Sequence, residues 1–209
     1  MKTIDKVILG TLFINGLDRN MSFLQVIKEK YKHDEETLRK SIDELINLGL
    51  IEKKHQILKL TQIGRESLKV VLVGGVFDLL HPGHISTLKS AKALGDILIV
   101  IIATTKTATK IKKDRIIYHN ENLRKEMVSS LSFVDLALIG KKGTLFDTVE
   151  YVKPDIIALG YDQTHTEKEI SENCKKRKLE IQILRLSTPV PKIKSSEIKK
   201  ELGEAFYKI

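Results

Sequence analysis

Hydrophobic residues in the last two thirds of the chain fall into short unbroken runs, separated by stretches with apolar residues at helical spacing. Continuous apolar runs are typical of parallel strands that are buried on both faces of a sheet. The alternation of runs and helical stretches predicts an α/β fold with a doubly wound, five-stranded parallel sheet. The runs lie at residues 70–73, 97–103, 136–139, 156–159 and 181–186, and the helical stretches at 85–94, 120–130, 145–152 and 167–178.

The first 68 residues follow a different pattern. Three stretches have apolar residues at helical spacing, two short runs then predict a hairpin, and a last helical segment follows. Asp34 is a suitable N-cap for the third helix, and Gly49 a suitable end. We therefore expect two domains, 1–68 and 69–209, with no Pro-, Gly- or Ser-rich linker between them. The first domain has its helical stretches at 7–13, 23–27, 38–48 and 61–68, and its hairpin strands at 50–54 and 57–60.

The end of the first domain resembles the end of a winged-helix domain. The strings Leu48-Gly49-Leu50-Ile51 and Leu60-Thr61-x-x-Gly64-x-x-x-Leu68 carry this resemblance. A winged helix suggests DNA binding through its third helix, which normally presents basic and amide side chains to the major groove. Here that helix is acidic, and carboxylates repel phosphates. We therefore expect a dimerising or regulatory module and a homodimer, while the basic wing at Lys53 and Lys54 leaves DNA binding open.

Composition narrows the class of protein. The chain has 209 residues and a net charge of +9, so its field attracts anions. Residues 1–68 carry 12 basic and 10 acidic side chains, a balance of +2, and the remainder carries +7. No apolar stretch reaches the roughly 18 residues of a membrane span, no leader is recognisable, and the single cysteine, Cys174, fits a reducing compartment and a buried structural role. We expect a cytoplasmic protein without membrane contact.

The loop after the first strand of the sheet carries the clearest chemistry. Gly74 and Gly75 let the backbone approach a ligand closely, and a helix that opens at or just after His84 offers N–H groups and partial positive charge to phosphate. The loop lacks the Gly-x-Gly-x-x-Gly of dinucleotide sites and the Gly-Lys-Ser/Thr of P-loops. His81 and His84 have two alternative interpretations, zinc ligands or structural histidines, but nothing adjacent supplies further zinc ligands.

The string from Gly75 to His84, Gly-Val-Phe-Asp-Leu-Leu-His-Pro-Gly-His, resembles the G-T-F-D-x-x-H-x-G-H motif of the HxGH nucleotidyltransferases. Val76 stands where the family usually has threonine. The resemblance extends over residues 69 to about 202 and implies a Rossmann-like nucleotidyltransferase fold. It also implies a reaction in which a substrate phosphate attacks the α-phosphorus of a nucleoside triphosphate and pyrophosphate leaves. Mg²⁺ or another divalent cation would accompany the triphosphate, and no metal-ligating residue is assigned.

The resemblance also implies the residues of the site. His81 and His84 would donate hydrogen bonds to the α- and β-phosphates, while Lys110 and Lys112, in the basic run after the second strand, would neutralise developing charge. Arg124, in a segment that resembles the family's R-x-x-x-V helix, has an alternative as a helix-surface arginine paired with Glu121 or Glu126. The remaining residues implied to bind the nucleotide are Gly75, Val76, Phe77, Asp78, Gly83, Gly160, Asp162, Ser195 and Ser196.

Two segments indicate which nucleotide and acceptor are used. Cytidylyltransferases for glycerol phosphate or phosphocholine carry an arginine near the position of Val190, which is missing here. Residues 155–163 and 194–198 are more similar to archaeal-type FAD synthases, which join FMN to the AMP part of ATP. We therefore favour ATP over CTP and FMN as acceptor, with Lys192 and Lys194 available for its phosphate. The alternatives are a CTP-dependent enzyme acting on glycerol 3-phosphate and a DNA-binding regulator that senses a nucleotide or flavin.

Overall fold

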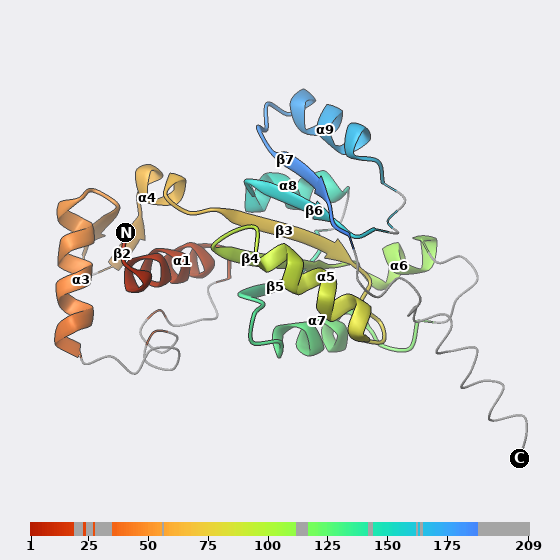
Figure 1. Ribbon diagram of the computed structural model, residues 1–209, viewed down its shortest axis with the longest axis horizontal. Coiled ribbons are helices and arrows are strands. Elements are labelled where there is room, and N and C mark those ends of the chain that lie inside the picture. Colours follow the sequence, from red (N-terminus) through yellow and green to blue (C-terminus); the bar gives the residue numbers. More distant parts are fainter. Residues whose placement is uncertain are drawn as a thin grey trace, which may run out of the picture. The chain divides into compact units, whose positions relative to one another are not determined.

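A computed structural model describes residues 1–18, 23, 27, 35–55, 57–111, 117–141, 144–161, 163 and 165–187. The chain divides into two compact units, Met1–Lys69 and Val70–Ile209 (Figure 1). The predicted cap Asp34 and most of the helix predicted at 23–27 lie outside the described residues, as do Lys112, Asp162, Val190, Lys192, Lys194, Ser195 and Ser196.

The first unit contains helices around a small apolar core and a two-stranded hairpin. Its elements are α1 (Thr3–Leu17), α3 (Glu35–Asn47), β1 (Ile51–Lys54), β2 (Ile57–Leu60) and α4 (Gln62–Glu66). Ile8, Leu9, Leu45 and Ile51 are at most 2% exposed and form its centre. Gly49 has the left-handed φ of 71° that follows a helix end, as its place in the sequence predicts. The winged-helix interpretation of this unit stays a prediction.

The second unit contains the predicted five-stranded sheet. Its strands run in the order β5-β4-β3-β6-β7, and every neighbouring pair is parallel. The prediction of a doubly wound parallel sheet is therefore confirmed. Each strand coincides with a predicted apolar run to within two residues: β3 (Val70–Gly75), β4 (Ile97–Ile102), β5 (Leu136–Ile139), β6 (Ile156–Leu159) and β7 (Gln182–Arg185).

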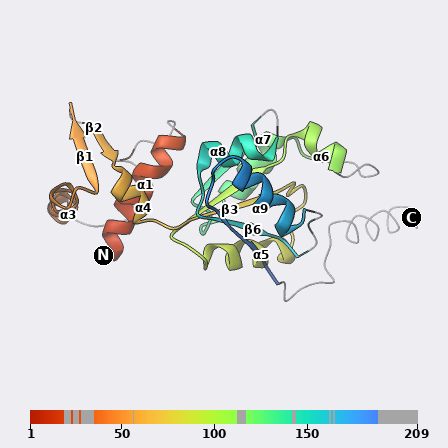
Figure 2. The ribbon, with the colours of Figure 1, turned by 90° about the horizontal axis from the view of Figure 1, so that it is seen from above.

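Helices cover the sheet, and in Figure 2 α5 and α8 lie on opposite sides of β3. The helices of this unit are α5 (Pro82–Lys92), α6 (Thr105–Ile111), α7 (Glu121–Ser129), α8 (Leu145–Val152) and α9 (Glu167–Lys176). The sequence did not predict α6, because its Thr- and Lys-rich stretch has no apolar periodicity, although Ala108 is buried. No helix in the described part of the chain is long and apolar enough to cross a membrane.

The strand order reverses between β3 and β6, since the chain moves outward from β3 through β4 to β5 and then returns to the other side of β3. The β3–β4 pair extends over six residues, whereas the β3–β6 pair extends over only two. We call this short β3–β6 pairing the seam. Side chains form hydrogen bonds across it at both of its ends. The Asp155 carboxylate accepts from the Val70 amide at 2.6 Å, and the Gln163 side-chain amide donates to the Gly74 carbonyl at 2.6 Å.

Candidate functional site

Among the residues that the structure describes, the predicted site residues of the second unit lie in the segments that follow the carboxyl ends of β3, β4 and β6. The loop after β3 carries the two histidines, and the loop after β6 begins at Gly160. These two strands flank the reversal in strand order, where open α/β sheets bind their ligands. The topology thus brings segments about 80 residues apart to one edge of the sheet (Figure 1).

His81 and His84 lie together at the N-terminus of α5. The helix begins at Pro82, earlier than predicted, because the His81 ring acts as its N-cap: Nδ1 accepts a hydrogen bond from the Gly83 amide at 3.2 Å. That bond leaves the proton of a neutral ring on Nε2. The two histidine rings are tilted by 30° with centroids 3.9 Å apart. Two imidazoles at a helix N-terminus form a site suited to phosphate oxygens.

Gly75 and Phe77 shape the backbone that leads to the histidines. Phe77 adopts a left-handed φ of 52°, and its buried ring lies over Gly75, so that a Cβ at Gly75 would be 2.6 Å from the ring. The same ring meets His84 edge-on, with centroids 5.3 Å apart. A side chain at position 75 would therefore have to displace the Phe77 ring. Val76 is buried, so this side chain contributes packing where the family motif has a hydroxyl.

Asp78 connects the loop to the segment before α7. Its carboxylate is 1% exposed and accepts from the amides of Tyr118 and His119, both at 3.0 Å. The His119 ring bonds the Asp78 carbonyl through Nδ1 at 2.9 Å. The buried charge is thus satisfied by backbone donors. In this structure Asp78 fixes the shape of the loop from within.

Arg124 lies inside the protein. The alternative that places it on the surface of its helix is wrong, because the residue is 0% exposed on the inward face of α7. Its guanidinium donates to three carbonyls, those of Val76, Ala103 and His119, at 2.7, 2.8 and 2.9 Å. Burial lowers the pKa of Arg124. Nη2 is buried and has no hydrogen-bond partner among the described residues, so one donor remains for an incoming group.

Lys110 stands in the last turn of α6, after β4, and is exposed. The start of α6 is tied to the start of α7 by a hydrogen bond between the Thr105 hydroxyl and Glu121. That bond is the main reason why the pKa of Glu121 is lowered. The structure thus places one of the two predicted lysines on the loop side of the sheet, while Lys112 lies outside the described residues.

The loop after β6 is held by a residue that the sequence analysis missed. Arg185, at the end of β7, donates to the carbonyls of Gly160, Gln163 and His165 at 2.9, 3.1 and 2.6 Å. Its guanidinium also binds both carboxylate oxygens of Glu167, at 2.8 and 2.9 Å. The only signal in the sequence is an arginine directly after the apolar residues Ile183 and Leu184 in a strand, a position where a charge needs a specific partner.

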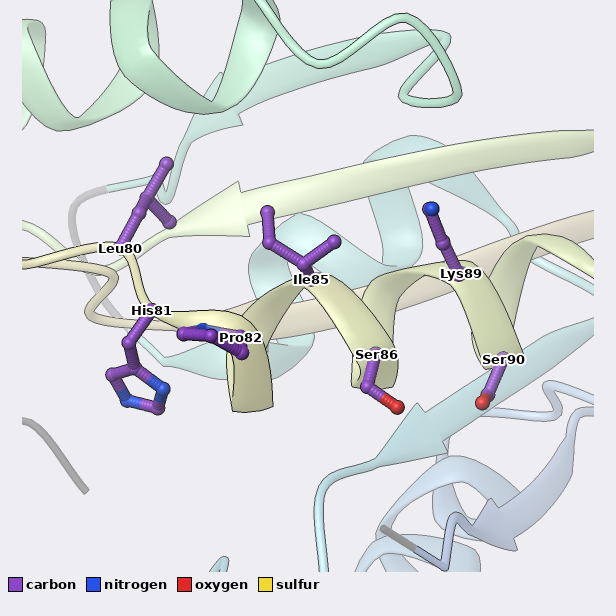
Figure 3. Close-up of a pocket in the computed structure, with 7 residues that line it drawn as sticks. All are labelled: Leu80, His81, Pro82, Ile85, Ser86, Lys89 and Ser90. Atoms are coloured by element: carbon purple, nitrogen blue, oxygen red, sulfur yellow. The ribbon is translucent and has the colours of Figure 1, made fainter. Parts of the chain in front are cut away.

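A pocket of about 680 Å³ opens beside His81 along α5. Figure 3 shows the side chains of Ile85 and Lys89 on one side of the helix and those of Ser86 and Ser90 on the other. Leu80 and Ile85 supply aliphatic surface to the lining of this pocket. Among the residues that the structure describes, no three His, Cys, Asp or Glu side chains are grouped as a protein-held metal ion requires.

Known proteins resemble this chain in the same region. Residues 72–201 match the model of a protein family described as cytidylyltransferase-like. The FAD synthase of Aciduliprofundum boonei is 48% identical over 116 residues, 56% of this chain and 76% of that protein. The FAD synthase of Picrophilus torridus is 47% identical over 137 residues, 65% of this chain and 97% of that protein. A solved structure from Thermoplasma volcanium, described as a lipopolysaccharide core biosynthesis protein, is 42% identical, with a TM-score of 0.55 over 58% of this chain and 98% of its own.

Proposed function

The chain belongs to the cytidylyltransferase-like family, and on that premise we propose that it is an FMN adenylyltransferase, which joins the AMP part of ATP to FMN and releases pyrophosphate. The observation that carries the proposal is the pair His81 and His84 at the N-terminus of α5, beside the reversal in strand order. The relatives that are 47–48% identical and named FAD synthase support ATP and FMN as the substrates.

In the proposed reaction, a phosphate oxygen of FMN attacks the α-phosphorus of ATP and the bond to the β-phosphate breaks. Negative charge increases on the pyrophosphate oxygens as they leave, so the site must supply positioned donors. Nε2–H of His81 can donate to a phosphate because Nδ1 is engaged with Gly83. His84 would add a second donor, and Lys110, in the last turn of the helix that follows β4, a positive charge. No covalent intermediate on the protein is required.

Arg124 and Asp78 have a supporting part in this proposal. Both hold backbone rather than pointing outward, and together they join the loops after β3 and β4 to the segment before α7. Preorganised backbone keeps the catalytic donors in place and avoids a reorganisation cost during the reaction. The unused Nη2 of Arg124 is the atom through which this arginine would meet the nucleotide or its phosphates.

The rest of the proposed nucleotide site follows the family resemblance. Gly75 and Gly83 allow close backbone approach, and Gly160 with Asp162 would face the base and sugar. Lys112, Ser195 and Ser196 would add contacts to the triphosphate. Since no cluster of ligands for a metal ion exists among the described residues, we infer that Mg²⁺ enters bound to ATP, where it neutralises phosphate charge.

FMN as acceptor needs an apolar surface for its three-ring system and, beside it, groups that bind its phosphate. The chain has no Trp and an aromatic content of 5%, so the wall must be largely aliphatic. Leu80 and Ile85 in the pocket beside His81 provide surface of that kind. This pocket therefore supports FMN as acceptor.

A product assay tests the proposed function. The full chain is incubated with ATP or CTP, each with FMN or glycerol 3-phosphate, in Mg²⁺, and products are separated by chromatography. FAD formed from ATP and FMN alone is the expected result. CDP-glycerol formed from CTP and glycerol 3-phosphate would replace the proposal by its cytidylyltransferase alternative.

For the first unit we propose a role in chain association or regulation, with a homodimer as the functional form. Helix α3 is acidic on its exposed surface, where Glu36 pairs with Lys40, and this favours association over DNA binding. Deleting residues 2–69 should lower the number of chains per particle, obtained by ultracentrifugation as the particle mass divided by the mass of one chain, and leave ATP binding intact. Retention of a labelled DNA duplex by the full chain, lost on the same deletion, would favour the regulator instead.

A further inference from the structure

Arg185 makes an unusual set of contacts for a residue with no part in the reaction. Five hydrogen bonds leave its guanidinium, three to the carbonyls of Gly160, Gln163 and His165 and two to the Glu167 carboxylate. The three carbonyls belong to one short loop, the loop that follows β6. The planar guanidinium of Arg185, which we call the fork, therefore fixes three backbone positions of this loop at once.

Glu167 orients the fork. It lies in the first turn of α9, where a carboxylate is favoured by the helix dipole, and it is half exposed at its side chain. Its two oxygens bind Nε and Nη2 of Arg185, which sets the plane of the guanidinium. The hydrogen bond from Arg185 lowers the pKa of Glu167, so the pair is charged at neutral pH.

The loop is connected in turn to β3. The backbone carbonyl of Gln163 accepts from Arg185, and the side chain of the same residue donates to the Gly74 carbonyl at 2.6 Å. Gly74 directly precedes the glycine over which Phe77 folds. Through Gln163, Arg185 is therefore linked to Gly74, at the end of β3. The loop that carries His81 and His84 starts from this strand end, across the short β3–β6 pairing.

We propose that Arg185 is a positioning residue that holds the loop after β6 in its nucleotide-binding conformation and thereby sets the affinity for ATP. This inference rests on the proposed function, because that function places the nucleotide against this loop. Without the arginine, the nucleotide itself must order the loop. The entropy lost in ordering the loop then weakens the binding of ATP. The chemical step at His81 and His84 is left nearly unchanged, since Arg185 contacts neither residue of that pair in the structure.

The test compares Arg185→Gln with a matched variant, Arg177→Gln. Arg177 is also about one third exposed at its side chain, pairs with a glutamate, Glu150, and donates to a carbonyl, but all of these contacts lie on α8 and α9 away from the loop. Arg185→Gln should raise the KM for ATP about tenfold, the loss of roughly one charge-assisted hydrogen bond. It should leave kcat within about threefold and the KM for FMN unchanged.

ATP affinity is also measured directly, by calorimetric titration of each variant with Mg-ATP in the absence of FMN. The affinity should fall about tenfold in Arg185→Gln and stay within about twofold in Arg177→Gln. Arg185→Lys, which keeps the charge and loses the fork, should give an intermediate value. If Arg185→Gln does not fold, Glu167→Gln replaces it, with an expected loss of ATP affinity of about threefold.

Equal effects of Arg185→Gln and Arg177→Gln on ATP affinity would overturn the inference, as would a fall in kcat with the KM for ATP unchanged. Failure of the proposed function gives a different pattern. If the unaltered chain binds Mg-ATP but forms no FAD, the assignment of FMN as acceptor is wrong, while a selective loss of ATP affinity in Arg185→Gln still supports the role of the arginine.

Discussion

Two loops border the proposed site, and each is held by one arginine, but in different surroundings. Arg124 is fully buried and binds the carbonyls of Val76, Ala103 and His119 with no carboxylate hydrogen-bonded to it in the described residues. Arg185 is 28% exposed at its side chain, binds three carbonyls of the loop after β6 and is held by Glu167. The loop after β3 is thus anchored in the protein interior at Val76, whereas the loop after β6 is held at the surface.

This difference has energetic consequences. Removing the buried guanidinium leaves the buried Val76 carbonyl without its donor, and such a group costs more than a lost surface ion pair. Folding and loop geometry are therefore inseparable at Arg124. At Arg185 water can replace the lost donors, so the loop can change while the fold persists. The contrast shows that substitutions which alter the loop after β3 also destabilise the fold, whereas the loop after β6 can be altered while the fold is retained.

The largest expected effect is on the fold. Arg124→Met should lower the free energy of unfolding by about 3 kcal/mol, because one buried and two partly buried carbonyls lose their donor. Arg185→Met, its counterpart on the other loop, should cost about 1 kcal/mol or less. Urea unfolding followed by circular dichroism measures both. Similar losses in the two variants would erase the distinction between the loops.

The next effect is on catalysis at the loop after β3, which leads to His81 and His84. His84→Ala should lower turnover about 100-fold while the melting temperature changes little, because the ring donates to charge that develops in the transition state. His55→Ala, at an exposed turn of the first unit, is the control and should leave FAD formation unchanged. Near-normal turnover of His84→Ala would show that the loop after β3 does not carry the chemistry.

Two neighbouring glycines test how tightly the loop after β3 is packed. A Cβ at Gly75 meets the buried Phe77 ring at 2.6 Å, whereas a Cβ at Gly74 has nothing within 4 Å. Gly75→Ala should therefore cost about 1–3 kcal/mol of folding free energy, and Gly74→Ala about 0.5 kcal/mol or less. Denaturant titration of both variants measures the difference. Equal stability would mean that the Phe77 ring yields easily.

The smallest effect concerns how acid changes the contribution of Glu167, which holds Arg185 against the loop after β6, to the melting temperature. The pKa of Glu167 is lowered mainly by its hydrogen bond from Arg185, so its contribution is complete above the ordinary glutamate pKa and is lost as the pH falls through the lowered value. The difference in melting temperature between the unaltered chain and Glu167→Gln should be constant near neutral pH and shrink in acid.

The same scan in the Arg185→Gln background serves as the control. There, Glu167→Gln should make a smaller pH-dependent difference, because only the backbone hydrogen bond and the helix dipole then lower the pKa of Glu167. An undiminished pH-dependent difference without Arg185 would show that the arginine is not the main partner of this carboxylate.

The sheet could be predicted from the sequence because its strands are apolar runs that differ sharply from their flanks, as at Ile97–Ile102. The positions of His81 and Gly75 followed from their motif. Arg124 could not be placed, because a single arginine on a helix with acidic neighbours reads as a surface residue, and only the tertiary fold shows that it faces inward. Arg185 escaped notice because its partners are backbone carbonyls, which no sequence pattern reveals. Helix α6 depends on packing of Ala108 rather than on periodicity.

The short seam between β3 and β6 has a consequence for motion. The sheet has only two paired residues there, against six between β3 and β4, and the ends are closed by Asp155 and Gln163. Hydrogen bonds of a ladder open cooperatively, and the line with the fewest opens at the lowest cost. Amide protons along this line should exchange with solvent sooner than those on the β3–β4 side. The sheet is therefore expected to open most easily along the line beside which the two substrates are proposed to meet.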